Sequence, residues 1–386
     1  ILVFLLKVGV LVGIAVYARR QAQLADELAA QDAIALIDTA GRAVTLPQGT
    51  RLTVAGKLDG ATPAFDAVSR DGSHFRIPLT DVQDAATREK RPLALLPGFR
   101  SVLAGLEWRW LLFAFLLFGP PLFMMAVRWW ILLAASGIDV PFFTLVRLHY
   151  LGFFFNTFMP GGAGGDVIKA VYLTRHCQKK AEAATIVVVD RVVGLMGLLA
   201  LAGAVVIVQP AMRKGVAAPI AALAIAMTMG FALFFSPGFR KVVRYEALLM
   251  RLPRAEVLAR IDAALYGLRH RAGALAAALG LTVILQLLEV IAVSFAGRSL
   301  SLDHARFSHY LAFVPIGYVV NALPISFGGV GLMEGAFLAL FRDAGAATAT
   351  QGFMLGVVAR LLVIGWGLLG AVSALFPPDG SRMSPE

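Results

Sequence analysis

The chain has 386 residues, of which 59% are hydrophobic and only 15% are charged, and its mean hydropathy is +0.77. This composition excludes a water-soluble globular domain and predicts an integral membrane protein. The net charge of +11 does not call for nucleic acid as a partner, because in a membrane protein the distribution of Lys and Arg over the loops matters more than their sum.

Apolar stretches of about 20 residues, the length that crosses a bilayer as a helix, predict the membrane spans. Six stretches qualify, at residues 1–17, 109–134, 184–208, 217–236, 273–296 and 351–375. The first has the charge pattern of a secretion signal, but its length and the lack of a clear small-residue cleavage site predict a transmembrane anchor.

The basic segments 174–182 and 237–272 are expected on the cytoplasmic side of the membrane. Counting spans from these segments predicts a multi-pass protein of the cell (inner) membrane with both termini in the cytoplasm. Residues 18–107 then lie outside, and residues 377–386 form a cytoplasmic tail.

Residues 18–107 predict a small extracytoplasmic domain rich in β-structure with flanking helices. The stretch RRQAQLADELAAQDAIALI, residues 19–37, mixes polar and apolar residues and predicts a helix that continues the first span. The stretches AVTL, RLTVAGKL and HFRIPL alternate in the period of a strand, around LDG and RDG turns, and predict a β-barrel or β-roll. No set of nucleophile, base and ligand residues converges there, so we expect a structural module or one that binds a protein partner.

Neither cofactors nor metals are expected from the remaining motifs. The single cysteine, Cys177, permits no intrachain disulfide and no cysteine metal cluster. Residues 254–271 carry apolar side chains on one helical face among arginines, and predict either a helix on the inner membrane surface or an ordinary solvated helix packed on the core.

Two segments, residues 149–173 and 309–340, share an ordered series of features and predict an internal repeat. Each begins with His-Tyr-Leu, at His149 and His309, and each continues through apolar residues to an asparagine. The features that follow in the first copy are Asn156, Pro160, Gly161, Gly162, Gly164, Gly165 and Asp166. Those in the second copy are Asn321, Pro324, Gly328, Gly329, Gly331 and Glu334.

Proline and clustered glycines interrupt backbone pairing, and lipid offers no substitute hydrogen-bond partners. Each copy is therefore predicted to be a re-entrant hairpin, at 141–175 and 309–342, within a transmembrane domain at 108–376. In the topology above, the two hairpins enter from opposite sides of the membrane. Inverted repeats with broken helices are typical of transporters, whose binding site lies near the bilayer midplane.

The acids at the hairpin tips have two interpretations. Helices that begin near Asp166 and Glu334 direct unpaired N–H groups at a cavity, where an anionic group such as phosphate can bind. The acids are then either transport residues or simple helix caps. Lys169 is predicted to pair with Asp166, and Asn156 and Asn321 to hold the tips by side-chain hydrogen bonds.

Charges deep in the predicted spans are expected to be paired or to line a pathway. Glu289, beside Gln286, is expected to pair with Arg360, and Asp190 and Arg191 begin deep in the third predicted span. Such a pair is either part of a transport route or a buried structural contact. Three arginines, Arg128, Arg147 and Arg175, are expected at the inner headgroup level, and His149 and His309 near opposite membrane surfaces.

The elements NTFMPGGAGGD and PISFGGVGLME, with DRVVGLMGLL at 190–199, resemble the flippase-like membrane domain of lysylphosphatidylglycerol synthases and their stand-alone relatives. The resemblance covers roughly residues 105–375. It implies an all-α polytopic membrane protein with about six transmembrane helices and two inverted re-entrant hairpins, here with a small extracytoplasmic β domain inserted after the first span.

This resemblance implies a lipid translocase, not an enzyme, that moves an anionic phospholipid or a lipid-linked sugar between leaflets. No soluble aminoacyltransferase domain follows residue 375, so synthesis of aminoacyl lipid is not expected. Two alternatives remain at this point: an integral-membrane lipid-modifying enzyme such as a glycosyltransferase, and a membrane scaffold that transports nothing. The sequence has no DxD pair, HExxH motif or P-loop, which are typical of some such enzymes and of ATP-driven pumps.

Overall fold

The structure is a computed structural model. It describes residues 26–48, 50–58, 63–83, 91–159, 164–176, 180–208, 271–322 and 331–375, and within 229–266 only 229–230, 233, 236–242, 245, 250, 259, 262 and 266. The predicted anchor at 1–17, the C-terminal tail, and most of the predicted span at 217–236 and of the segment 254–271 lie outside the described residues.

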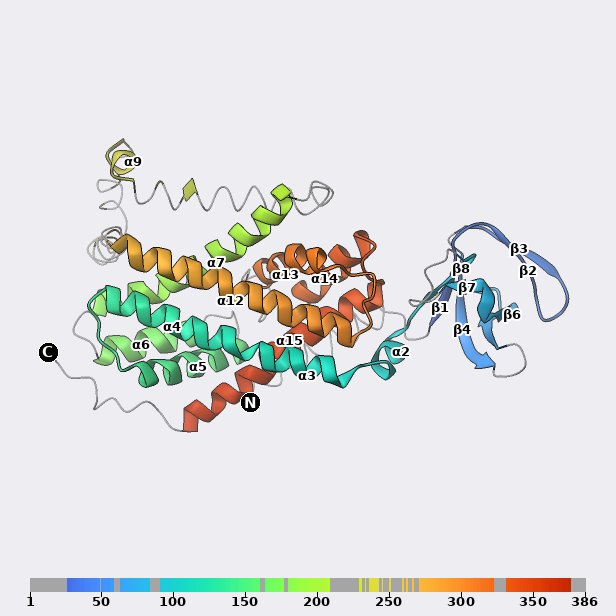
Figure 1. Cartoon of the computed structure of the whole chain (residues 1–386), viewed down its shortest axis with the longest axis horizontal. Coiled ribbons are helices and arrows are strands. Elements are labelled where there is room, and N and C mark those ends of the chain that lie inside the picture. Colours follow the sequence, from blue (N-terminus) through green and yellow to red (C-terminus); the bar gives the residue numbers. More distant parts are fainter. Residues whose placement is uncertain are drawn as a thin grey trace.

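The first described part is a β domain beyond one end of the helical part (Figure 1). Its strands are β1 (Glu27–Ala30), β2 (Ile34–Ile37), β3 (Ala43–Leu46), β4 (Arg51–Leu58), β5 (Ala64–Val68), β6 (His74–Pro78), β7 (Val82–Gln83) and β8 (Leu93–Leu96), with the 3-10 turn η1 (Leu79–Asp81) before β7. Six of them form one sheet in the order β6-β5-β4-β1-β8-β7, all antiparallel except β7 with β8, and β2 pairs with β3 in a separate hairpin.

The predicted strands are present, but the helix predicted for residues 19–37 is wrong where the structure describes it. Residues 27–30 and 34–37 are strands β1 and β2. Strand β1 lies between β4 and β8 and bonds to both. Pairing on two sides, together with burial of Leu28 and Ala30, outweighs the helix propensity of Glu, Leu and Ala.

The helices of the second part follow in chain order. They are α2 (Phe99–Ala104), α3 (Trp108–Leu117), α4 (Gly119–Ala135), α5 (Phe142–Phe158), α6 (Gly164–His176), α7 (Lys180–Val208), α9 (Pro237–Val242), α12 (Ala272–Ser299), α13 (Phe307–Ala322), α14 (Leu332–Asp343) and α15 (Ala349–Leu375). The protein is thus mostly helical, with a small β region near the N-terminal end of the described chain.

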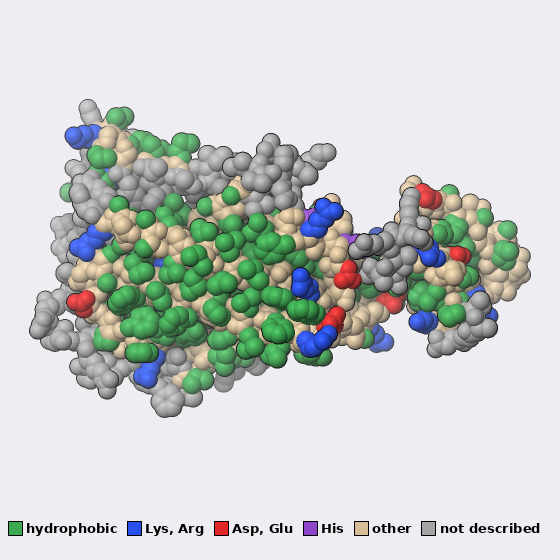
Figure 2. Space-filling view, in the orientation of Figure 1, with side chains coloured by type: hydrophobic (Ala, Val, Ile, Leu, Met, Phe, Trp, Pro, Cys, Tyr) green, Lys and Arg blue, Asp and Glu red, His purple; other side chains and the backbone are tan. Residues whose placement is uncertain are grey.

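Four segments are long and apolar enough to cross a membrane: residues 108–135, 183–204, 272–299 and 349–372. They coincide with four of the six predicted spans, and the first consists of α3 and α4 together. Large apolar side chains on these helices face outward, among them Trp108, Leu112, Ile284 and Leu368. Figure 2 shows hydrophobic side chains over the visible face of the helical part and charged side chains gathered at its end next to the β domain, as expected for a surface in contact with lipid.

Packing within the helical part repeats itself. If α4, α5, α6 and α7 are matched in order to α12, α13, α14 and α15, most contacts of one set recur in the other. Helix α5 packs on α15 as α13 packs on α7, α6 packs on α7 as α14 packs on α15, and α4 packs on α12. Figure 1 shows α4 and α12 running in opposite directions. The repeat seen in the sequence is therefore part of a larger unit of four helices.

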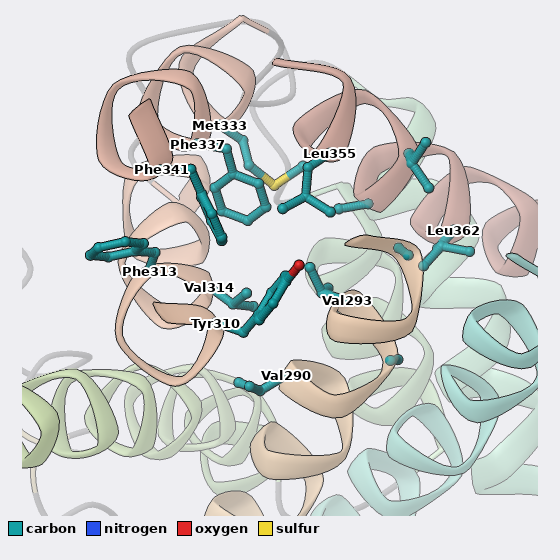
Figure 3. Close-up of a cluster of buried hydrophobic side chains, with 14 of the residues drawn as sticks. Val290, Val293, Tyr310, Phe313, Val314, Met333, Phe337, Phe341, Leu355 and Leu362 are labelled. Atoms are coloured by element: carbon teal, nitrogen blue, oxygen red, sulfur yellow. The ribbon is translucent and has the colours of Figure 1, made fainter. Parts of the chain in front are cut away.

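Aromatic and branched side chains fill the core around the second set of helices. In Figure 3, Tyr310 and Phe313 of α13 face Phe337 and Phe341 of α14, and Leu355 of α15 closes the cluster. The rings of Tyr310 and Phe341 have centroids 5.2 Å apart, and so do those of Phe313 and Phe341. This packing fixes α14, and with it Glu334, against α15.

Candidate functional site

Each repeat brings together an asparagine, an acid and an arginine from three successive helices. In the first polar set, Asn156 near the end of α5 accepts a hydrogen bond from the Gly165 amide at 2.7 Å through Oδ1, and its Nδ2 lies 3.3 Å from Asp166 Oδ1. Arg191 on α7 forms an ion pair with the other oxygen of Asp166. The side chains of Arg191 and Asp166 are 46% and 18% exposed, so the arginine remains accessible from outside the pair.

The second polar set has the same composition. Glu334 in the first turn of α14 forms an ion pair with Arg360 on α15, and Arg360 Nη2 also lies 3.3 Å from Asn321 Oδ1 near the end of α13. The Glu334 carboxylate in addition accepts the Gly331 amide at 2.8 Å, so it caps its helix as one of the two interpretations predicted. This pair is buried, with 12% of the Arg360 and 1% of the Glu334 side chain exposed.

The predicted pair of Glu289 with Arg360 is wrong, because Arg360 contacts Glu334 instead. The reason is the close approach of α14 to α15 at Gly356, where a Cβ atom would lie 2.7 Å from the Glu334 Cα. Gly356 precedes Arg360 by one helical turn, so the glycine brings the acid within reach of the guanidinium.

The predicted pair of Lys169 with Asp166 is also replaced by other contacts. Lys169 Nζ lies 3.2 Å from His149 Nδ1 and 4.9 Å from the centre of the Trp129 ring, while Arg191 takes the Asp166 carboxylate. His149 is buried in the middle of α5. His309 lies at the start of α13, where its Nδ1 accepts the Arg306 amide at 3.1 Å, so the two histidines are not structural equivalents.

Arg128 is buried on α4. Its Nε lies 2.8 Å from Asp190 on α7, and its Nη1 lies 3.0 Å from Thr282 Oγ1 on α12. Arg147 and Arg175 are exposed. Asp190 and Arg191 are adjacent in sequence but have different partners. Asp190 pairs with Arg128 in the core, and Arg191 pairs with Asp166 in the first polar set.

Of the glycines predicted at the hairpin tips, the structure describes Gly164, Gly165 and Gly331. Gly164 and Gly165 begin α6, and a Cβ on Gly165 would lie 1.7 Å from the Gly152 carbonyl oxygen, so α5 and α6 touch there through their backbones. Gly331 has a φ of +88°, which favours glycine, and precedes α14. The other predicted tip residues, Pro160, Gly161, Gly162, Pro324, Gly328 and Gly329, lie outside the described residues.

The sequence interpretation did not find that Arg128 is buried or that Trp129 and Tyr318 line the polar interior. A charged residue inside the apolar stretch 109–134 was the available signal, because a buried arginine calls for a partner. For Trp129 and Tyr318 the sequence gives no signal that separates them from core aromatics.

Among the described residues, no group of three or more His, Cys, Asp or Glu side chains is arranged to hold a metal ion. The polar sets offer two guanidinium groups, each paired with an acid in the first turn of a short helix, α6 or α14. Guanidinium groups are suited to binding phosphate or carboxylate oxygens.

Searches of curated proteins and of solved structures found no significant match. A family model described as the lysylphosphatidylglycerol synthase TM region matches residues 94–370, more than half of the chain. The match begins in β8 and therefore leaves out most of the β domain. The four apolar helical segments and this match indicate a multi-pass membrane protein tied to lipid handling. The chain belongs to the family of lysylphosphatidylglycerol synthase transmembrane regions.

Proposed function

We propose that the protein moves an anionic phospholipid or a lipid-linked sugar between the two leaflets, through a path between the first helix pair (α5 and α6) and the second helix pair (α13 and α14). The observation that carries the proposal is the recurrence of one polar set, Asn-acid-Arg, at equivalent places of two matched four-helix units.

The lengths of the four helices support a re-entrant arrangement. They have 17, 13, 16 and 12 residues, and at about 1.5 Å per residue they are roughly 18–26 Å long. The hydrocarbon core is about 30 Å thick, so each helix pair enters the membrane and returns to the same side. The opposite directions of α4 and α12 support entry from opposite sides, which makes the units inverted repeats.

The first polar set supplies the cation for the headgroup. Arg191 is half-exposed and is held by Asp166, so a lipid phosphate competes with the carboxylate for the same guanidinium. The start of α6 adds the positive end of a helix dipole at the same place. The buried second set keeps its arginine paired until the conformation changes, which supports access from one side at a time.

The experiment is mass spectrometry of the lipids that copurify with the full chain from membranes. Selective enrichment of an anionic or sugar-linked lipid is expected in the wild type, compared with an unrelated membrane protein. Arg191→Gln is expected to lose the enrichment. The control is Arg342→Gln, since Arg342 is an exposed arginine that pairs with Asp343 away from both polar sets. The same lipid profile in wild type and Arg191→Gln contradicts the proposed site.

A further inference from the structure

Buried polar side chains continue from the Arg128–Asp190 pair along one face of α12. Thr282, Gln286 and Glu289 are spaced by four and three residues and are at most 6% exposed. Thr282 binds Arg128, and Gln286 Nε2 donates to the Gly194 carbonyl of α7 at 3.0 Å. The line crosses the interface between the two four-helix units and ends at Glu289.

Glu289 differs from the other buried acids because no hydrogen bond or ion pair joins it to any described residue. Two groups lie within electrostatic reach of it, Arg128 from α4 and the Tyr318 hydroxyl from α13.

Among the described side chains, the remaining acids and arginines on the helices packed against α12 have other partners, and Arg191 on α7 binds Asp166. Asp190 on α7 binds Arg128, and Arg360 on α15 binds Glu334. Arg109 on α3 is exposed and lies 3.4 Å from Glu107.

Two polar side-chain atoms close to Glu289 have no hydrogen-bond partner among the described residues: the Gln286 oxygen needs a donor, and the Tyr318 hydroxyl needs an acceptor. Within the described part of the chain, Gln286 Oε1 and Tyr318 Oη are buried without a hydrogen-bond partner. The amide nitrogen of Gln286 is committed to Gly194, so its oxygen must find a donor elsewhere. Glu289, three residues further along the same face of α12, is a candidate donor when it is protonated, whereas an unpaired carboxylate among apolar helices is costly.

We propose that Glu289 binds and releases a proton, and that this step couples lipid movement to a proton gradient. The coupling rests on the proposed function. With the proton bound, Glu289 is neutral and Arg128 stays with Asp190 of α7 and Thr282 of α12. With the proton released, the carboxylate attracts Arg128 along α12, from Thr282 towards Glu289 and away from Asp190. Because Arg128 contacts both units, this movement of its guanidinium gives the proton a way to bias their arrangement.

Proton binding is tested without any lipid transport, by infrared difference spectroscopy of the purified full chain between acidic and alkaline buffer. The wild type is expected to show the carbonyl band of a protonated carboxyl group in acidic buffer that disappears in alkaline buffer. Glu289→Gln is expected to lack that band, and Glu107→Gln, at an exposed acid, to retain it. Identical difference spectra for wild type and Glu289→Gln would overturn the assignment of the proton to Glu289.

Coupling is tested in vesicles of phosphatidylethanolamine and phosphatidylglycerol that contain a trace of fluorescent phosphatidylglycerol. With one proton per lipid, a gradient of one pH unit is expected to shift the steady-state distribution of the probe about tenfold in the wild type. Glu289→Gln is expected to exchange the probe without that shift, and Glu107→Gln to behave as the wild type. A wild type that exchanges the probe but ignores the gradient overturns the coupling alone. A wild type that exchanges no probe at any pH contradicts the proposed function, and the infrared result still decides whether Glu289 binds a proton.

Discussion

The ion pair of Arg128 and Asp190 shows how a charge is tolerated inside the helical part. Their side chains are 6% and 12% exposed. Such a pair adds little net stability compared with apolar residues, but removing one partner leaves a buried charge uncompensated. The pair therefore contributes more to which helices pack together, here α4 and α7, than to the free energy of unfolding.

Arg128→Met is expected to lower the free energy of unfolding by about 3–5 kcal/mol, because Asp190 is left without its cation. The double variant Arg128→Met with Asp190→Leu is expected to recover most of that loss. Thermal unfolding in detergent measures both. Equal losses in the single and the double variant would contradict the role of the pair.

Asp38 gives the β domain a pH dependence that can be measured. The Arg42 backbone amide donates to Asp38 Oδ1 at 2.7 Å and lowers the pKa of this carboxyl, helped by the Arg42 side chain. Because the folded pKa lies below the unfolded value of about 4, the stabilisation is complete above that pH and is lost as the pH falls through the folded pKa.

Hydrogen exchange of residues 34–46, corrected for the intrinsic effect of pH on exchange, is expected to show this loss in the wild-type chain. Asp38→Asn is expected to remove it. The same fall in protection below about pH 4 in both chains would assign the effect to another group.

At the scale of single residues, the sequence singled out all six members of the two polar sets but not how they pair. Asn156, Asp166 and Glu334 stood out because the repeat placed them beside proline and glycine. The pair of Glu289 with Arg360 was inferred from depth alone, and depth does not determine which face of a helix meets which neighbour. The glycine at Gly356 decides that contact, and the sequence alone does not indicate which helix approaches it.

At the scale of elements, glycines set how closely the helices approach each other. A Cβ on Gly165 would overlap the backbone of Gly152 on α5, and one on Gly370 would lie 2.4 Å from the Tyr150 carbonyl oxygen. Small residues at such crossings allow close backbone packing, which is the main source of helix association in lipid. By contrast, a Cβ on Gly335 in α14 meets nothing within 4 Å.

Gly165→Ala is expected to destabilise the protein by about 1–3 kcal/mol or more, since the added methyl group meets backbone that cannot rotate away. Gly335→Ala is the matched control, in a helix with open space, and is expected to leave stability unchanged or raise it by up to about 1 kcal/mol. Thermal unfolding of the two variants is compared. A Gly165→Ala protein as stable as Gly335→Ala would contradict the close crossing of α5 and α6.

The sequence predicted the long helices better than the strands. Apolar length alone located the four described spans. Strands β1 and β2 were predicted as helix because residues 19–37 mix polar and apolar residues and follow the first predicted span. Their partners β3, β4 and β8 lie up to 69 residues away in the chain. Pairing over such separations is tertiary information, which local propensity does not contain.

At the scale of the whole molecule, the two four-helix units provide the membrane core and the β domain is attached at one end (Figure 1). The family match covers the core and leaves out most of the β domain, so the shared function belongs to the helices. The sequence revealed the repeat through its tips, but the exchange of partners between units, α5 with α15 and α13 with α7, required the structure.

The most direct test of lipid movement through these two sets is a flipping assay in proteoliposomes with a fluorescent phospholipid. The wild type is expected to make the probe of both leaflets accessible to a membrane-impermeant quencher. Asp166→Asn and Glu334→Gln are expected to slow this exchange strongly when equal amounts of folded protein are reconstituted. Asp343→Asn, an exposed acid on the same helix as Glu334, is expected to match the wild type. Wild-type flipping rates in both Asp166→Asn and Glu334→Gln would contradict the account.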